Sequence, residues 1–226
     1  MLRVMNRRIF LILSALLAAA AQTAQCQTTA PADFNQTAPR GALKLFFAAD
    51  IRGDGQAMRR LLLTANAAEE RMAAAMAGKK DADRELTGAL ETRFPDPSKP
   101  DPRAGAEAQL PGIFATIDQS EQQINGDTAT LKAAGGDSPP FTLQRVDGKW
   151  RIPLAVLLQN VEPDFLADQA RQIEIQIKVM KSAAVDVAAG KYSTREQAVE
   201  DVKQQMFNAA VADHVAATSQ PAATQP

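Results

Sequence analysis

The chain has 226 residues, enough for one ordinary domain with extensions or for two small domains. Hydrophobic residues make up 46% and charged residues 23% of the chain, proportions that allow a globular protein to bury a core without disulfide bonds. The formal net charge of −1 lacks the basic excess of proteins that bind DNA or RNA on their surface. The composition therefore argues against a nucleic-acid partner.

Residues 1–25 have the layout of a secretory signal peptide. Arg3, Arg7 and Arg8 precede a nearly unbroken apolar stretch at 9–21 that ends in small residues. This stretch is shorter than the roughly 20 residues of a transmembrane helix, and an uncleaved N-terminal anchor is the alternative reading. We therefore expect an exported protein of the periplasm or cell envelope, whose net charge of −1 becomes −4 once three arginines are removed.

The single cysteine, Cys26, is a candidate lipidation site. It directly follows the apolar stretch, where a bacterial lipoprotein carries its lipid. Gln25, directly before it, fits a lipoprotein signal poorly, so cleavage near Ala21 or Ala24 that leaves a free thiol is the alternative. A lone cysteine excludes a disulfide within the chain in either case.

Helical patterns dominate from residue 37 to residue 93. After a flexible Gln-, Thr- and Pro-rich leader at 26–36, Thr37 can cap a helix that starts at Pro39 and ends at Gly53. Asp54 can cap a second helix. Good helix formers then predict two helices, 66–78 and 80–93, or one helix that bends at Gly78.

A β-meander is expected over residues 113–155. Its predicted strands are 113–117, 128–133 and the two arms of a hairpin at 140–153. Asn125-Gly126-Asp127 is a turn, and Asp147-Gly148 suits the positive φ angles of a type I′ turn. The interpretation is a four-stranded antiparallel sheet.

The C-terminal third returns to helix. Pro163 starts a long helix and Gly190 ends it, and a capping box at Ser193-Thr194-Arg195-Glu196 begins the next. One face of the first helix carries a heptad seam spaced 4-3-4-3-4, formed by Leu166, Ala170, Ile173, Ile177, Met180 and Ala184. The seam packs either within the chain or, alternatively, against a second copy or a partner helix. Residues 161–216 are thus predicted to form a helical hairpin, followed by a disordered tail at 217–226.

The order of elements resembles the NTF2-like (SnoaL-like, cystatin-like α+β) superfamily. The resemblance covers roughly residues 37–156 and rests on three stretches: 38–63 with its Gly53-Asp54 break, the strand pair joined at the turn 125–127, and Arg145-Val146-Asp147-Gly148-Lys149-Trp150-Arg151-Ile152. It implies an α+β fold in which N-terminal helices pack inside a curved four-stranded sheet to form a cone with an apolar pocket. Within a domain at 37–160, the helical segment 64–112 is longer than a minimal member needs, and the hairpin after residue 160 is additional.

No catalytic or metal-binding residue can be matched to this family. The only tyrosine, Tyr192, lies in the turn of the C-terminal hairpin, and the only histidine, His214, has no ligand partner nearby. Asp50 and Asp118 are weighed as general bases but are better explained as solvated carboxylates. Trp150 is better explained as a core residue than as a ligand contact. The predicted lining of an apolar pocket is Phe46, Ile117, Leu131, Leu143 and Ile152.

The sequence therefore favours an exported, non-enzymatic binding or assembly module of the cell envelope, with no cofactor. A small-molecule carrier, or a SnoaL-like isomerase or hydrolase that uses the apolar pocket, is the alternative function. A purely structural envelope protein that assembles through its long helices is a third.

Overall fold

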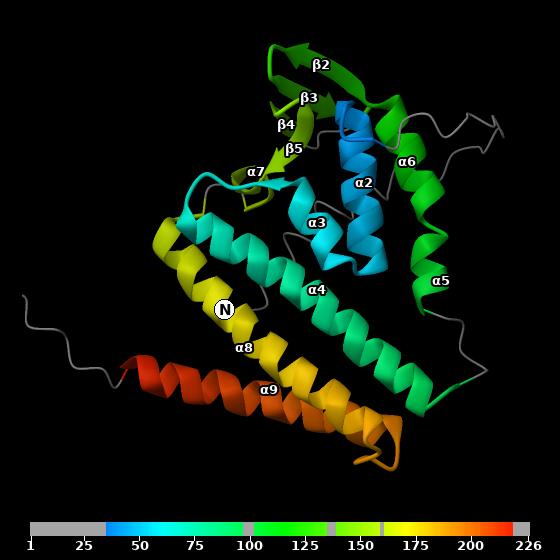
Figure 1. The fold of residues 1–226 in the computed structure, drawn as a ribbon, viewed down its shortest axis with the longest axis vertical. Coiled ribbons are helices and arrows are strands. Elements are labelled where there is room, and N and C mark those ends of the chain that lie inside the picture. Colours follow the sequence, from blue (N-terminus) through cyan, green and yellow to red (C-terminus); the bar gives the residue numbers. More distant parts are fainter. Residues whose placement is uncertain (1–34, 97–101, 135–138, 159–160, 219–226) are drawn as a thin grey trace, which may run out of the picture.

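The computed structural model describes residues 35–96, 102–134, 139–158 and 161–218. The predicted signal peptide, Cys26, most of the leader and the tail after residue 218 lie outside the described residues. The described chain has an α+β fold with a five-stranded mixed sheet in the order β1-β5-β4-β3-β2. Figure 1 shows the sheet at one end of the molecule and the long helices at the other.

Four of the strands form the antiparallel meander: β2 (Glu121–Asn125), β3 (Thr128–Lys132), β4 (Phe141–Val146) and β5 (Lys149–Pro153). The β4–β5 hairpin is confirmed together with its turn, since Asp147 and Gly148 have φ angles of 53° and 72°, both positive as a type I′ turn requires. The fifth strand, β1 (Leu62–Leu63), was not predicted. It pairs with β5 in parallel and makes the sheet mixed.

The strand predicted at 113–117 is wrong, because these residues lie in helix α6 (Leu110–Gln119). Leu110, Ile113 and Ile117 recur at a spacing that places them on one helical face, and Leu110 and Ile117 are buried. Pro111 suits the first turn of a helix. The first strand of the meander is instead β2, whose five residues are all exposed and so carry no apolar alternation.

Helix α2 (Pro39–Arg52) covers one face of the sheet. Phe46 and Phe47 are buried, and the ring of Phe47 lies 6.3 Å from that of Phe141 on β4. Ala38 occupies the N-cap position without a side-chain hydrogen bond, so the predicted cap at Thr37 is wrong. Pro39 follows it, which leaves fewer backbone N–H groups for a cap to satisfy.

Helix α3 (Gly55–Leu61) begins at the predicted cap, where the Asp54 side chain accepts a hydrogen bond from the Ala57 N–H at 2.8 Å. Its first residue, Gly55, touches the backbone of α4 (Ala67–Arg93): a Cβ at this position would lie 2.0 Å from the carbonyl oxygen of Ala77. Only glycine allows α3 and α4 to approach this closely.

Helix α4 is one continuous helix, which continues through Gly78 and is capped by Asn66. It lies parallel to helix α8 (Pro163–Ala188), and Figure 1 shows the two side by side. Arg71 pairs with Glu174 near one end of the contact. The pair forms a layer of long helices below the sheet and α3. The short helices α5 (Pro102–Glu107) and α7 (Leu154–Leu158) connect the larger elements.

Helix α9 (Arg195–Thr218) packs on α8 after a turn at Gly190, whose φ is 77°. The helix begins one residue later than the capping box predicts. Thr194 Oγ1 accepts from the Gln197 N–H at 3.2 Å, and the Gln197 side chain accepts from the Ser193 N–H at 3.0 Å. A small second core cluster joins α4, α8, the turn and α9 through Leu90, Val187, Tyr192 and Ala198.

The heptad seam of α8 is used within the chain. Leu166 and Ala170 belong to the main core, Ile173 packs against it, and Met180 is 2% exposed. A Cβ on Gly78 of α4 would lie 3.1 Å from Cδ1 of Ile177. Small residues on α4 therefore allow the larger side chains of the seam to pack closely against it.

Candidate functional site

The five residues predicted to line a pocket come together in one place, but as part of the packed core. Their exposed fractions run from 0% to 7%, and all five belong to the main hydrophobic cluster. The residues concerned are Phe46 on α2, Ile117 on α6, Leu131 on β3, Leu143 on β4 and Ile152 on β5. They hold the sheet to the helices that cover it.

Trp150 is a core residue, as predicted. Its side chain is 2% exposed and belongs to the same cluster. The guanidinium of Arg145, opposite it on β4, lies 5.4 Å from the centre of a Trp150 ring and covers the end of the core by a cation–π contact. Arg145 also pairs with Asp127 at 2.8 Å, so this arginine is held by the sheet itself.

The two carboxylates weighed as general bases each pair with a lysine. Asp50 lies 2.6 Å from Nζ of Lys80, and Asp118 lies 2.6 Å from Nζ of Lys44. The Lys44 side chain is 7% exposed and that of Asp118 is 49% exposed, so a cation on the buried side of α2 is balanced by a carboxylate at the surface. Both pairs tie neighbouring helices together, which accounts for these carboxylates without a catalytic role.

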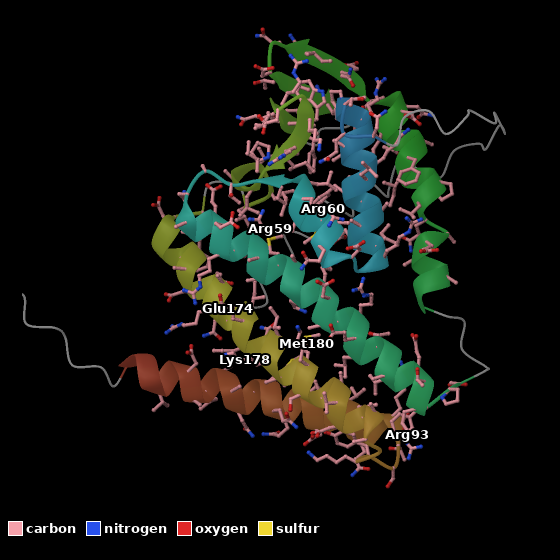
Figure 2. All side chains as sticks on the ribbon, in the orientation of Figure 1. Arg59, Arg60, Arg93, Glu174, Lys178 and Met180 are labelled. Atoms are coloured by element: carbon pink, nitrogen blue, oxygen red, sulfur yellow. The ribbon has the colours of Figure 1, made fainter. Side chains whose placement is uncertain are left out.

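A network of charges links α3 to the layer formed by α4 and α8. Arg59 of α3 pairs with Glu70 of α4, and Arg71 of α4 makes a two-bond pair with Glu174 of α8, with N–O distances of 2.8 and 2.7 Å. Figure 2 labels Arg59 of α3 and Glu174 of α8, the two helices that contact α4 from either side. Hydrogen bonding to Arg71 lowers the pKa of Glu174 below its usual value. The two hydrogen bonds from Arg71 to Glu174 indicate that this pair links α4 to α8.

The most distinctive polar group is a cluster around Tyr192, in the turn between α8 and α9. The Tyr192 side chain is buried, its hydroxyl donates to the Asp201 carboxylate, and the Gln205 side-chain amide donates to the same carboxylate at 2.7 Å. A shallow open hollow of about 600 Å³ lies beside it. Its lining is Lys191, Tyr192, Gln197, Glu200, Asp201 and Gln204.

The cluster around Tyr192 has a structural role: its hydrogen bonds hold the turn between α8 and α9 against α9. Burial, followed by the hydrogen bond and negative charge of Asp201, raises the pKa of Tyr192 to about 12. The hydrogen bond from Tyr192 lowers the pKa of Asp201 in turn. At neutral pH the phenol therefore stays protonated as a donor and the carboxylate stays charged as an acceptor, which suits neither a nucleophile nor a base. The sequence places both residues in the hairpin, but only the structure shows that they meet.

Helix α9 carries apolar side chains on two opposite faces. Ala198 and Val202 are buried on the face toward α8. Phe207, Val211 and Val215, spaced four residues apart, are 64%, 46% and 56% exposed and form an apolar row on the outer face. His214 lies on this helix, but its side chain is outside the described part of the chain.

Within the described ranges there is no group of three or more His, Cys, Asp or Glu residues that could hold a metal ion. In the same ranges no helix is both long enough and apolar enough to cross a membrane. Comparison with protein-family models, curated proteins and solved structures found no match to this chain.

Proposed function

We propose that the chain is an exported, non-enzymatic binding or assembly module of the cell envelope, built on an NTF2-like domain with a helical hairpin extension. The observation that carries the proposal is the packing of the five predicted pocket residues, none more than 7% exposed, into the core. A site for chemistry in this family lies inside the cone, where those side chains meet. The binding role is therefore assigned to the outside of the molecule.

Three further features support this proposal. The carboxylates weighed as bases are engaged in ion pairs between helices. The phenol of Tyr192 is held protonated at neutral pH. The signal-like layout of residues 1–25 supports export, and the apolar row on α9 gives the extension an outer surface that differs from ordinary solvated helix.

The interior is tested with an apolar fluorescent probe that binds hydrophobic cavities. The wild-type chain should leave the probe fluorescence unchanged, because the five predicted pocket residues are packed into the core. Saturable binding at one site by the wild type would overturn the proposal and favour the pocket-based carrier or isomerase.

Export is tested by fractionating cells that express the full chain. The protein should appear in the envelope or periplasmic fraction, and a variant that places two aspartates in the apolar stretch at 9–21 should stay in the cytoplasm, because the stretch could no longer enter the export pathway. Wild-type protein found only in the cytoplasm would remove the export half of the proposal.

A further inference from the structure

The two edges of the sheet are protected very differently. At one edge, β1 has only two residues, which pair with Ile152 and Pro153 of β5. The backbone N–H of Trp150, earlier on β5, donates instead to the carbonyl oxygen of Gln36 at 2.7 Å, so this edge is covered by the chain itself. At the other edge, β2 presents five exposed residues with a continuous register against β3, and it contains no proline, lysine or bulge. Natural proteins use those devices to prevent strand pairing between molecules, and β2 lacks them. Figure 1 shows β2 at the outer limit of the molecule.

The register fixes which backbone groups face outward. The β2–β3 hairpin closes through the two-residue turn Gly126-Asp127, so Asn125 and Thr128 form a hydrogen-bonded pair. Alternation along the strand then makes Gln123 and Glu121 hydrogen-bonded to β3 as well. The N–H and C=O groups of Gln122 and Ile124 therefore point away from β3, toward the open edge.

The side chains leave room for a neighbour at this edge. Gln122 and Ile124 lie on the same face as the buried Ala129 and Leu131 that they oppose, which is the face covered by α2. Even there Gln122 is exposed and Ile124 is 51% exposed, so the covering helices stop short of the edge. A further strand can reach β2 without displacing any described element.

We infer that β2 pairs with β2 of a second copy of this chain, antiparallel, across a two-fold axis at Gln123. In that register Gln122 faces Ile124 of the second copy, and each such pair exchanges both backbone hydrogen bonds. The inference deepens the proposed function, on which it rests, by naming a second copy as the assembly partner.

The sequence of β2 is self-complementary in this register. Its only charged residue, Glu121, falls opposite the uncharged Asn125, and Gln123 falls opposite itself, where two side-chain amides can hydrogen-bond. No like charges meet. A parallel pair in register would instead place the two copies of Glu121 side by side, which favours the antiparallel arrangement.

The dimer is expected to be weak and in rapid exchange. Five residues on each side form a contact smaller than the roughly 1,200–2,000 Å² of a stable protein interface. The association is therefore concentration-dependent, and an envelope compartment that confines the chain would promote it.

The test is sedimentation of the full chain, expressed with its own leader and purified as the cell processes it, over a hundredfold range of concentration. The wild-type sample and every variant also carry Cys26→Ala, so that neither a lipid nor a disulfide links the copies. The wild type should shift from monomer toward dimer as concentration rises. Gln123→Lys and Gln123→Glu should each raise the dissociation constant at least about tenfold, because each places like charges together on the axis.

The decisive result comes from mixing the two variants. Gln123→Lys and Gln123→Glu together should restore the dimer, since opposite charges then meet, and added salt should weaken that recovery. Gln123→Thr is the matched control, because it is uncharged and suits a strand, and it should dimerise like the wild type. All variants should keep the wild-type melting temperature, since Gln123 is exposed.

Three outcomes would overturn the inference: a wild type that stays monomeric at every concentration, a mixture that fails to recover the dimer, or a dimer that is lost in Val211→Lys on α9 but kept in Gln123→Lys. None of them affects the export of the chain or the packing of its core, which the fractionation and probe experiments measure separately. A failed dimer and a failed proposed function are therefore distinguishable.

Discussion

Replacement of Gly55 by alanine tests the close contact between helices α3 and α4. The new Cβ would lie 2.0 Å from the carbonyl oxygen and 2.7 Å from the carbonyl carbon of Ala77, and 3.0 Å from Cγ of Asp81. The blocking atoms are mostly backbone of α4, so no side chain can rotate away. Helices α3 and α4 would have to separate by more than about 1 Å to reach ordinary contact distance.

The expected loss is about 2 kcal/mol of unfolding free energy, within the usual range for overpacking a core after the better helix propensity of alanine offsets part of the strain. For a chain of this size that loss lowers the melting temperature by about 4–8 °C. The measurement is urea and thermal unfolding followed by circular dichroism.

Gly112→Ala provides the matched control. Gly112 is also helical, and a Cβ there meets nothing within 4 Å. This substitution should stabilise the protein by about 0.5–1 kcal/mol, because alanine restricts the unfolded chain and favours helix. If Gly55→Ala is as stable as Gly112→Ala, then α3 and α4 do not meet as described and the packing argument is refuted.

Three other perturbations give separate readouts. The only tyrosine, Tyr192, should titrate with a midpoint near pH 12 in the folded protein and near 10 in urea. Its contribution to the free energy of unfolding is therefore fully present below pH 10 and is lost between pH 10 and 12. A native midpoint near pH 10, measured by ultraviolet absorbance, would contradict the buried hydrogen bond. Asp118→Asn should cost about 1–2 kcal/mol in urea unfolding, because the buried Lys44 ammonium loses the carboxylate that lies 2.6 Å from it. An unchanged midpoint would contradict a stabilising ion pair between α2 and α6. Leu143→Ala should cost about 3–4 kcal/mol, because Leu143 is fully buried; a cost near 1 kcal/mol would indicate an interior that is already hollow.

Two stretches show why the sheet was predictable in one half and not in the other. The β4–β5 hairpin carries its information locally, since Asp147-Gly148 accepts the required positive φ angles and Leu143, Trp150 and Ile152 alternate inward. The predicted strand at 113–117 failed because Ile113, Phe114 and Ile117 suit a strand by type. Their spacing with Leu110 instead fits the helical face that packs on α2.

The strand that replaced it could not be found from its own residues. All five positions of β2 are exposed and only Ile124 is β-branched, so neither apolar alternation nor residue type identifies it as a strand. Its conformation follows from pairing with β3, whose Ala129 and Leu131 are buried. The dependence of an edge strand on its neighbour is also why the open edge, and the inferred pairing across it, are visible only in the structure.

The candidate pocket and the seam show the same division. Residue type and spacing correctly identified Phe46, Leu143 and Ile152 as inward-facing, because the apolar residues of a single helix or strand already show which of its faces is buried. Whether those side chains enclose a space or fill it depends on how several elements close on one another. Likewise, the spacing on α8 showed a packing face, but not that α4 occupies it.

The sequence by itself determined the α+β class, the hairpin and its turn, the long helices and the identity of several core residues, because each follows from local backbone preference or from the periodicity of apolar residues. Tertiary structure alone decided that α3 and α4 meet at Gly55, that Tyr192 binds Asp201, that β1 joins β5 and that β2 is left as an open edge. These features join residues distant in the chain or in separate elements. The free energy of each contact depends on where both partners are placed, so a local sequence pattern cannot predict it.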